Sequence, residues 1–133
     1  MYMTGAPFFS ILLVPDESAE SSDEAAAKAD EKKEILCGTC GMGVTSPGYI
    51  TSRQGGTEHT FTNAYGYVFR VCCFKKAEGC IAAGIPTEEF TWFNGYIWEF
   101  ALCKNCHQHL GWFYRSADDS FFGLIRDSLI FPD

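Results

Sequence analysis

The sequence predicts a mainly β domain built from antiparallel strands. Short stretches rich in aromatic and β-branched residues recur at close spacing, and residues typical of turns separate them. Two pairs of cysteines, each with two residues between its members, accompany these stretches, one pair near their start and one in their second half. Hydrophobic residues make up 47% of the chain and aromatic residues 16%, which is a globular composition.

A change of composition near residue 35 divides the chain of 133 residues into two parts. Residues 16–34 carry −5 of the formal net charge of −7, so residues 35–133 are close to neutral. Residues 15–34 contain no aromatic or β-branched side chain and bury too little apolar surface to offset their ordering entropy. We expect residues 1–34 to form a disordered acidic tail and residues 35–133 to fold as one domain. The domain shows no basic stripe, which argues against nucleic-acid binding.

The first residues leave two interpretations open. Residues 6–14 (APFFSILLV) have the length of the apolar part of a secretory signal, but no lysine or arginine precedes them and no clean A-x-A site follows. The alternative is a frayed, partly apolar arm. No apolar run approaches the roughly 20 residues that span a bilayer, so we expect no membrane insertion.

The predicted strands follow one another closely through the domain, at residues 59–62, 67–74, 90–93, 96–102, 110–115 and 121–126. In the second of them, Tyr67, Phe69 and Val71 occupy alternate positions, as in a half-buried strand. Residues 63–66 (NAYG) have the composition of a turn between the first two strands. Residues 77–83 are expected to make one helical turn, which Gly84 and Pro86 end.

Four of the seven cysteines have the spacing of a metal site. Cys37 and Cys40 form one C-x2-C pair, Cys103 and Cys106 form a second, and 62 residues separate the two pairs. A C-x2-C turn places two thiolates on one side of a tight loop, and two such turns complete a tetrahedron around Zn²⁺. Disulfides or a redox C-x-x-C are the alternatives, but two pairs in one small domain favour one structural zinc ion. Such a site has no open position for catalysis.

The remaining cysteines and two histidines are weaker candidates for chemistry. His107 and His109 lie beside the second pair and could replace a thiolate, although four cysteines make this unnecessary. Cys72 and Cys73 are adjacent in a predicted strand, so their side chains face opposite sides. Buried, inert thiols are the expected state of these two and of Cys80. No basic or cationic residue directly adjoins these cysteines in the sequence, so the sequence does not indicate a catalytic cysteine among them.

Three tryptophans, Trp92, Trp98 and Trp112, fall within 21 residues around the second cysteine pair. They can form a cage for a flat guest, or they can fill the core of a small domain. The Asn94-Gly95 dipeptide is a strong signal for a two-residue hairpin. An ideal hairpin of that kind would place Trp92 and Trp98 on opposite faces of the sheet, so a shared cage needs a wider connection.

Several spaced motifs in this region make the sequence recognisable. They are residues 91–98 (TWFNGYIW), 102–106 (LCKNC), 109–114 (HLGWFY) and 121–124 (FFGL). Together they resemble the CULT domain, the thalidomide-binding domain of cereblon, which also occurs as small stand-alone proteins. The motifs run in family order through residues 35–133, and Gly84-Ile85-Pro86 and Asn63 also fall where the family has a G-x-P and a loop asparagine.

The resemblance implies a β-tent, in which two antiparallel sheets meet at an angle and a four-cysteine zinc site pins them. It implies that Trp92, Trp98 and Trp112 form three walls of a pocket above an aromatic floor at Tyr114. A cyclic imide would pack against the indoles, while backbone groups of Phe90 and Trp92 bond its N–H and carbonyls.

The resemblance also places Asn63 in a loop that closes over the ligand. Two departures alter the rim of the pocket: cereblon has histidine at the position of Phe90, and Ala64-Tyr65 replaces a Pro-His pair. Neither departure removes a wall. Ring binding is therefore expected to persist, while recognition of larger substituents is expected to change.

These observations favour a monomeric, non-enzymatic binding module for small cyclic imides, uracil-like rings or imide-bearing peptides. Binding of a ligase adaptor is not expected, because 34 further residues cannot hold the other parts of cereblon. A zinc-stabilised structural or protein-interaction domain is the first alternative. The second is a methionine-sulfoxide-reductase-like enzyme, which shares the fold but needs a late cysteine, and no cysteine follows Cys106. Three spare thiols favour a cytoplasmic location, with secretion as the alternative.

Overall fold

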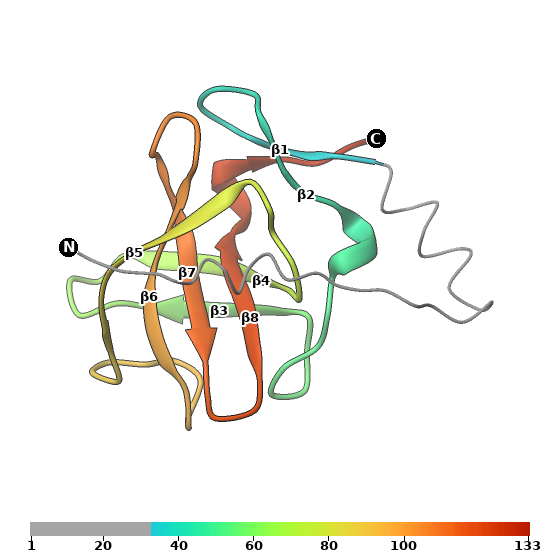
Figure 1. The fold of residues 1–133 in the computed structure, drawn as a ribbon. Coiled ribbons are helices and arrows are strands. Elements are labelled where there is room, and N and C mark those ends of the chain that lie inside the picture. The colour runs from blue at the N-terminus through green and yellow to red at the C-terminus, as the bar shows by residue number, and fades with distance from the viewer. Residues whose placement is uncertain (1–32) are drawn as a thin grey trace.

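A computed structural model describes residues 33–133. The apolar segment at residues 6–14 and all but the last two residues of the expected acidic tail lie outside the described residues. The strands of the described part are β1 (Ile35–Cys37), β2 (Gly43–Thr45), β3 (Glu58–Thr62), β4 (Val68–Phe74), β5 (Cys80–Thr87), β6 (Ile97–Cys103), β7 (His109–Arg115), β8 (Ser120–Ile125) and β9 (Leu129–Ile130) (Figure 1). Two single-turn 3-10 helices, η2 (Pro47–Tyr49) and η3 (Arg126–Ser128), complete the elements.

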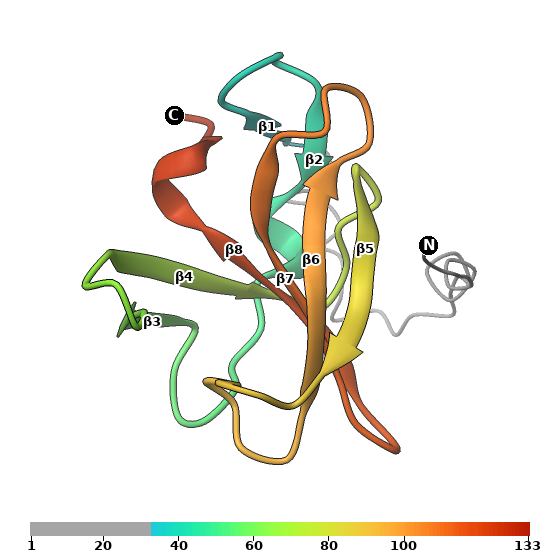
Figure 2. The ribbon, with the colours of Figure 1, turned by 90° about the vertical axis from the view of Figure 1, so that its left-hand side faces the viewer.

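The strands form two antiparallel sheets, which confirms the predicted fold class. The small sheet has the order β2-β1-β9, and the large sheet has the order β3-β4-β8-β7-β6-β5. The large sheet is strongly twisted: Figure 2 shows β3 and β4 running across the direction of β5 and β6. The small sheet lies at one end of the large one, beside the turn between β6 and β7 (Figure 1). Within residues 33–133, no helix is long and apolar enough to cross a membrane.

The large sheet separates two hydrophobic clusters, which we call the metal-end core and the aromatic core. The metal-end core contains Ile35, Cys37, Val44, Cys72, Phe74, Ala77, Cys80, Ala101, Cys103, Leu110, Phe113, Phe122, Leu124 and Leu129. The aromatic core contains Val71, Cys73, Phe93, Trp112, Tyr114, Phe121 and Ile125. Cys72 and Cys73 therefore face opposite sides of β4, as the sequence predicts.

The helical turn expected at residues 77–83 is wrong. This segment enters β5, which pairs with β6 from Cys80 opposite Cys103 to Thr87 opposite Trp98. The three alanines of the segment fit a helix by intrinsic preference, but pairing with β6 overrides that preference. Gly84, at φ 95°, coincides with the register irregularity between Ala83 and Thr87.

The strand expected at residues 90–93 is also absent, because these residues belong to a loop that spans residues 88–96. Phe90 adopts a left-handed conformation with φ 60°, which a strand does not tolerate. The hydroxyl of Thr91 donates to the Phe93 carbonyl at 3.2 Å and accepts from the Phe93 amide at 3.4 Å. These local bonds compete with sheet pairing and fold the segment back on itself.

Candidate metal centre and aromatic site

The four cysteines of the two C-x2-C pairs converge at one end of the domain. Their Sγ atoms all lie within 4.8 Å of one another. The Sγ atoms of Cys37 and Cys106 are 3.7 Å apart, and those of Cys40 and Cys103 are 3.6 Å apart. A tetrahedral zinc ion with Zn–S bonds of about 2.3 Å separates its sulfur ligands by about 3.8 Å. The sulfur cluster therefore has the dimensions of a zinc–tetrathiolate site.

Both pairs adopt the same local fold, which explains why the thiols converge. The amide of Gly41 donates to the Cys37 carbonyl at 2.9 Å, and the amide of His107 donates to the Cys103 carbonyl at 2.8 Å. Gly41 and His107 are both left-handed, with φ of 79° and 64°. His107 thus ends the second turn as glycine ends the first. Within residues 33–133, the cluster of potential metal ligands consists of the four cysteines and includes no histidine.

Polar groups around the sulfur cluster favour the thiolate of Cys40, whereas the pKa of Cys106 is raised beside the other sulfurs. Hydrogen bonds from the Asn105 side chain and the Met42 backbone lower the pKa of Cys40 to about 6. The Thr39 amide also donates to the sulfur of Cys37 at 3.4 Å. Because zinc binds the deprotonated thiol, such bonds stabilise the form that the metal requires.

The three other cysteines are buried and poorly suited to nucleophilic chemistry. Burial raises the pKa of Cys73 to about 11, and burial also raises the pKa of Cys72 and of Cys80. These thiols therefore stay protonated at neutral pH and pack as small apolar side chains.

At the other end of the domain, the three tryptophans belong to one continuous set of aromatic rings. In the register of β6 and β7, Trp98 lies opposite Tyr114 and Phe100 lies opposite Trp112, so all four side chains share one face. Edge-to-face contacts run from Trp98 to Phe100, from Phe100 to His109, from His109 to Trp112 and from Trp112 to Trp92, with centroid distances of 4.9–5.3 Å. Trp92 and Trp98 are the two ends of this arc.

The loop at residues 88–96 brings Trp92 to this face. The Asn94-Gly95 turn is present, with the Tyr96 amide donating to the Phe93 carbonyl at 3.0 Å, but it is only the tip of the loop. The connection is therefore wider than two residues, which removes the geometrical objection to a shared site. The indole N–H of Trp98 donates to the Glu89 carbonyl at 2.8 Å and ties the loop to β6.

The tryptophans are not equally buried. Trp112 is 8% exposed, whereas Trp92 and Trp98 are only partly buried. Tyr114, at 1% exposure, lies beneath this layer and contacts Phe93 and Phe121, with centroid distances of 4.7 and 5.1 Å. Burial raises the pKa of the Tyr114 phenol. This position is compatible with a floor beneath the indoles.

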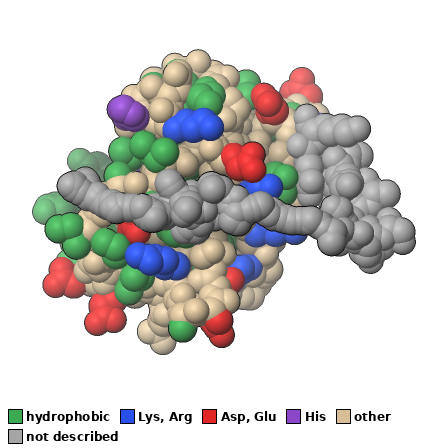
Figure 3. All heavy atoms as spheres, viewed as in Figure 1, with side chains coloured by type: hydrophobic (Ala, Val, Ile, Leu, Met, Phe, Trp, Pro, Cys, Tyr) green, Lys and Arg blue, Asp and Glu red, His purple; other side chains and the backbone are tan. Residues whose placement is uncertain are grey.

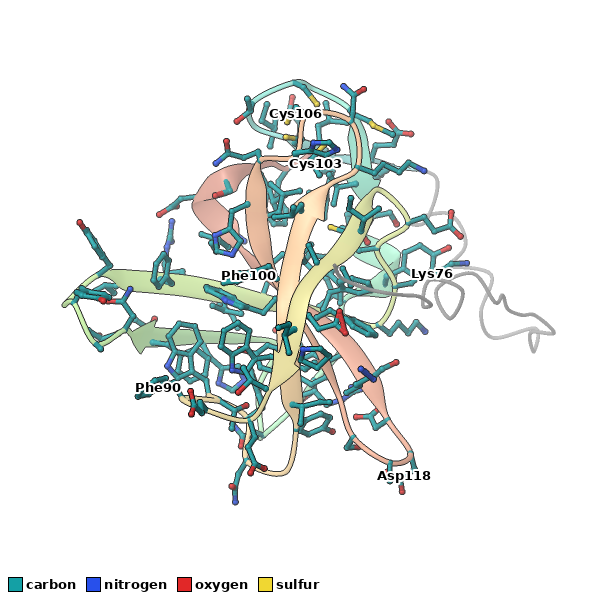
Figure 4. All side chains as sticks on the ribbon, turned by 60° about the vertical axis from the view of Figure 1, so that its left-hand side comes forward. Lys76, Phe90, Phe100, Cys103, Cys106 and Asp118 are labelled. Atoms are coloured by element: carbon teal, nitrogen blue, oxygen red, sulfur yellow. The ribbon has the colours of Figure 1, made fainter. Side chains whose placement is uncertain are left out.

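Two predicted ligand-binding residues, Phe90 and Asn63, lie outside the arc of ring contacts. The side chain of Phe90 is 83% exposed, and Figure 4 places it far from Cys103 and Cys106, with Phe100 between. The Asn63 carboxamide accepts hydrogen bonds from the amides of Tyr65 and Tyr67, at 2.9 and 3.0 Å, and so closes the β3–β4 turn. Within residues 33–133, neither side chain makes a ring contact or a hydrogen bond with an indole.

Sequence reasoning missed several residues that hold the tryptophans. Phe61 of β3 stacks on Trp92 with a centroid distance of 4.7 Å and an interplanar angle of 10°. Phe69 of β4 contacts both Trp92 and Trp112. Phe69 belongs to the alternating pattern of its strand, which could have indicated that it faces the same side as Val71. The contact of Phe61 with Trp92 could not be predicted from the sequence, because 31 positions separate the two residues and no pattern links them.

Comparison with known proteins places the two sites in context. No family model matches the sequence. The chain is 33% identical to the protein cereblon of Drosophila grimshawi over 81 residues, and 31% identical to those of Gallus gallus and Danio rerio over 80 residues. Each match covers 56% of this chain but only 12%, 18% and 19% of the three relatives. The chain thus spans less than a fifth of the length of these proteins.

The fold and the two sites define a small two-sheet β domain with a four-thiol cluster at one end and a tryptophan-lined face at the other. The matches confirm the predicted resemblance of this chain to a part of cereblon. On the side of the molecule that Figure 3 shows, acidic and basic side chains are interspersed where grey atoms do not cover them. Neither charge gathers there into a stripe.

Proposed function

We propose that this cereblon-like domain binds a small cyclic imide, such as a glutarimide, a succinimide, a uracil-like ring or an imide at the end of a peptide. The arrangement of Trp92, Trp98 and Trp112 carries the proposal. They come from a loop and two strands, share one arc of ring contacts, and leave two indoles partly exposed. A flat, uncharged ring gains dispersion and apolar burial against such surfaces.

Backbone groups next to Trp92 supply the polar half of the proposed recognition. Within residues 33–133, the amide and carbonyl of Phe90 and the amide of Trp92 make no hydrogen bond. The left-handed conformation of Phe90 turns this short segment out of any sheet ladder. Donors and acceptors at this spacing can pair with the N–H and carbonyl groups of an imide, which distinguishes it from a plain apolar ring.

We infer that the sulfur cluster holds one structural Zn²⁺ ion through Cys37, Cys40, Cys103 and Cys106. Four thiolates with tetrahedral spacing suit zinc and leave no coordination position open. The ion would join the turn after β1 to the turn after β6, and so link the two sheets. Its contribution is stability rather than chemistry. Binding without catalysis is the function that we propose for the domain.

A zinc-stabilised domain with a structural or protein-interaction role is the competing proposal. The edge-to-face contact of Trp92 with Trp112 and the near-complete burial of Trp112 favour it, because both are typical of a packed core. The two proposals differ in what they expect of the partly exposed indoles. A binding site uses these surfaces, whereas a structural core does not.

Titration with a glutarimide compound, followed by tryptophan fluorescence and calorimetry, distinguishes the two proposals. We expect saturable binding to the zinc-loaded protein and a loss of affinity of at least about tenfold in Trp98→Ala, since one buried ring contact is worth about 1.4 kcal/mol or more. Phe131→Ala is the matched control, because Phe131 is a partly buried aromatic packed on the metal-end core. Absence of binding by a folded protein with one zinc per chain would support the structural role.

A further inference from the structure

Trp92 is the only one of the three tryptophans that lies outside a strand. Trp98 and Trp112 are fixed by the pairing of β6 with β7. Trp92 belongs to the loop at residues 88–96, where no sheet ladder determines its position. Ring contacts with Phe61, Phe69 and Trp112 orient the indole of Trp92. The backbone of this loop has no strand partner, so polar contacts from other elements fix it.

Gln54 provides such contacts on both sides of Phe93. Its side-chain Nε2 donates to the Trp92 carbonyl at 3.3 Å, and its Oε1 accepts from the Asn94 amide at 3.4 Å. One carboxamide thus supplies a donor and an acceptor to a C=O and an N–H two residues apart. A neighbouring strand would offer the same pair of groups, so the Gln54 side chain replaces the missing sheet partner of the loop.

The backbone of Gln54 also indicates that the side chain has a role. Residues 53–56 form a two-residue hairpin turn, with Arg53 and Gly56 bonded to each other at 2.9 and 3.3 Å. Gln54 and Gly55 both have positive φ, 51° and 87°. Asparagine and glycine are favoured at the first of these positions, and a longer side chain is strained there. The glutamine at this position is explained by its longer side chain, whose carboxamide reaches the backbone of Trp92 and Asn94.

The turn that carries Gln54 is itself anchored. The Arg53 guanidinium donates to both carboxylate oxygens of Asp119, at 2.8 and 2.9 Å, and the Tyr96 hydroxyl bonds the same carboxylate. His59 Nε2 lies 2.8 Å from the Arg53 carbonyl. Gln54 is therefore presented from a fixed turn rather than from a free loop. Tyr96, at the end of the Trp92 loop, ties that loop to the same carboxylate.

We propose that Gln54 is a positioning residue for the aromatic site: its carboxamide holds the backbone around Trp92 and thereby fixes the indole wall and the neighbouring backbone groups that meet the imide. This inference rests on the proposed function for its consequence in binding. Its structural part, the bond between Gln54 and the Trp92 loop, is independent of any ligand.

The variants Gln54→Asn and Gln54→Gly test this role without disturbing the turn. Both residues suit a positive φ, but asparagine is one methylene shorter and glycine has no carboxamide. Hydrogen exchange of the Asn94 amide, measured by NMR without ligand, reports the bond directly. We expect exchange to accelerate about fivefold, the effect of losing one net hydrogen bond, and the affinity for a glutarimide to fall about fivefold. Gln108→Asn, the same change at an exposed position of the metal end, should alter neither quantity.

Each outcome decides one part of the inference. Faster Asn94 exchange together with weaker glutarimide binding in both variants, at an unchanged melting temperature, supports it. Unchanged exchange in both variants overturns it, whatever the ligand does. Faster exchange with unchanged affinity overturns the positioning role. If the wild-type protein binds no glutarimide at all, the proposed function fails, and the exchange experiment still decides whether Gln54 holds the loop.

Discussion

The metal end and the aromatic end of this domain lie on one large sheet but are held together differently. At the metal end, Cys37 and Cys103 are fully buried beside aliphatic side chains, and the four clustered sulfurs come from turns with matching hydrogen bonds. At the aromatic end, Phe93 and Phe121 are fully buried, but the layer above them is partly exposed and one of its members stands in a loop.

This difference suggests a division of labour. A closed tetrathiolate site contributes free energy of folding and offers nothing to a ligand. A layer of partly exposed indoles contributes less to folding, because burial of its apolar surface is incomplete, but it can gain further burial when a ring binds. The polar groups that fix this layer, Gln54, Asp119 and the loop backbone, are individually weak.

Loss of the metal site should have the largest effect. Apparent zinc affinities of structural sites amount to about 10–16 kcal/mol, which matches or exceeds the total stability of about 5–15 kcal/mol of a small domain. We expect Cys103→Ser, or chelation of the wild-type protein, to unfold the domain at room temperature. Circular dichroism and zinc stoichiometry measure this loss.

Cys80→Ala is the control for the metal prediction, because Cys80 is buried in the same core and is not one of the four clustered cysteines. It should cost only about 1–2 kcal/mol and retain one zinc per chain. A Cys103→Ser variant that melts like Cys80→Ala would show that the metal end does not depend on the thiolates.

The anchor at Asp119 should have an intermediate, pH-dependent effect. The Arg53 guanidinium beside it lowers the pKa of this carboxyl below its usual value. A lowered folded-state pKa stabilises the fold above the unfolded-state pKa of about 4, and this stability is lost as the pH falls through the folded-state value. Asp119→Asn should therefore reduce the free energy of unfolding by about 1–2 kcal/mol at pH 7.

Denaturant titrations across the pH range check this expectation. The difference between Asp119→Asn and wild type should shrink below about pH 4. Asp118→Asn removes a neighbouring exposed carboxylate whose hydrogen-bond partner is Ser116, and it should change stability little at any pH. An equal loss in both variants at pH 7 would mean that the Arg53 pair contributes nothing beyond the general charge of the loop.

The two ends also differ in how far the sequence could predict them. The cysteine spacing was sufficient to predict the cluster, because C-x2-C turns are local and their chemistry limits the partners. Alternation predicted β4, and aromatic content predicted β7, although β7 is buried along its interior positions rather than on alternate ones. Residues 77–83 and 90–93 were mispredicted for opposite reasons: strand pairing outweighed helix preference in the first, and local side-chain bonds outweighed aromatic content in the second.

The supports of the aromatic site could not be found from the sequence. Gln54 reaches the Trp92 loop across 38 residues, and Arg53 reaches Asp119 across 66. Neither pair has a characteristic spacing, because tertiary structure alone brings the partners together. The positive φ of Gln54 was equally hidden, since glutamine has no turn preference that a sequence pattern would reveal.

The smallest expected effect concerns the side chain of Phe90. Removing this side chain distinguishes ligand recognition by the backbone of Phe90 from recognition by its ring. This side chain is 83% exposed, and only backbone groups of Phe90 are assigned to the imide. Phe90→Ala should therefore change the free energy of unfolding by no more than about 0.5 kcal/mol, as for ordinary surface positions. Its affinity for a glutarimide should stay within about threefold, which corresponds to about 0.7 kcal/mol.

Phe93→Ala is the matched control in the same loop. Phe93 is fully buried and packs edge-to-face on Tyr114 and Phe121, so its loss should cost about 3–5 kcal/mol in thermal or denaturant unfolding. The two alanine variants, only three residues apart, would then differ in the free energy of unfolding by most of what a buried phenylalanine contributes. If Phe90→Ala instead abolished glutarimide binding while the melting temperature stayed unchanged, the exposed ring itself would contact the ligand, and recognition at this end would not be a matter of backbone geometry alone.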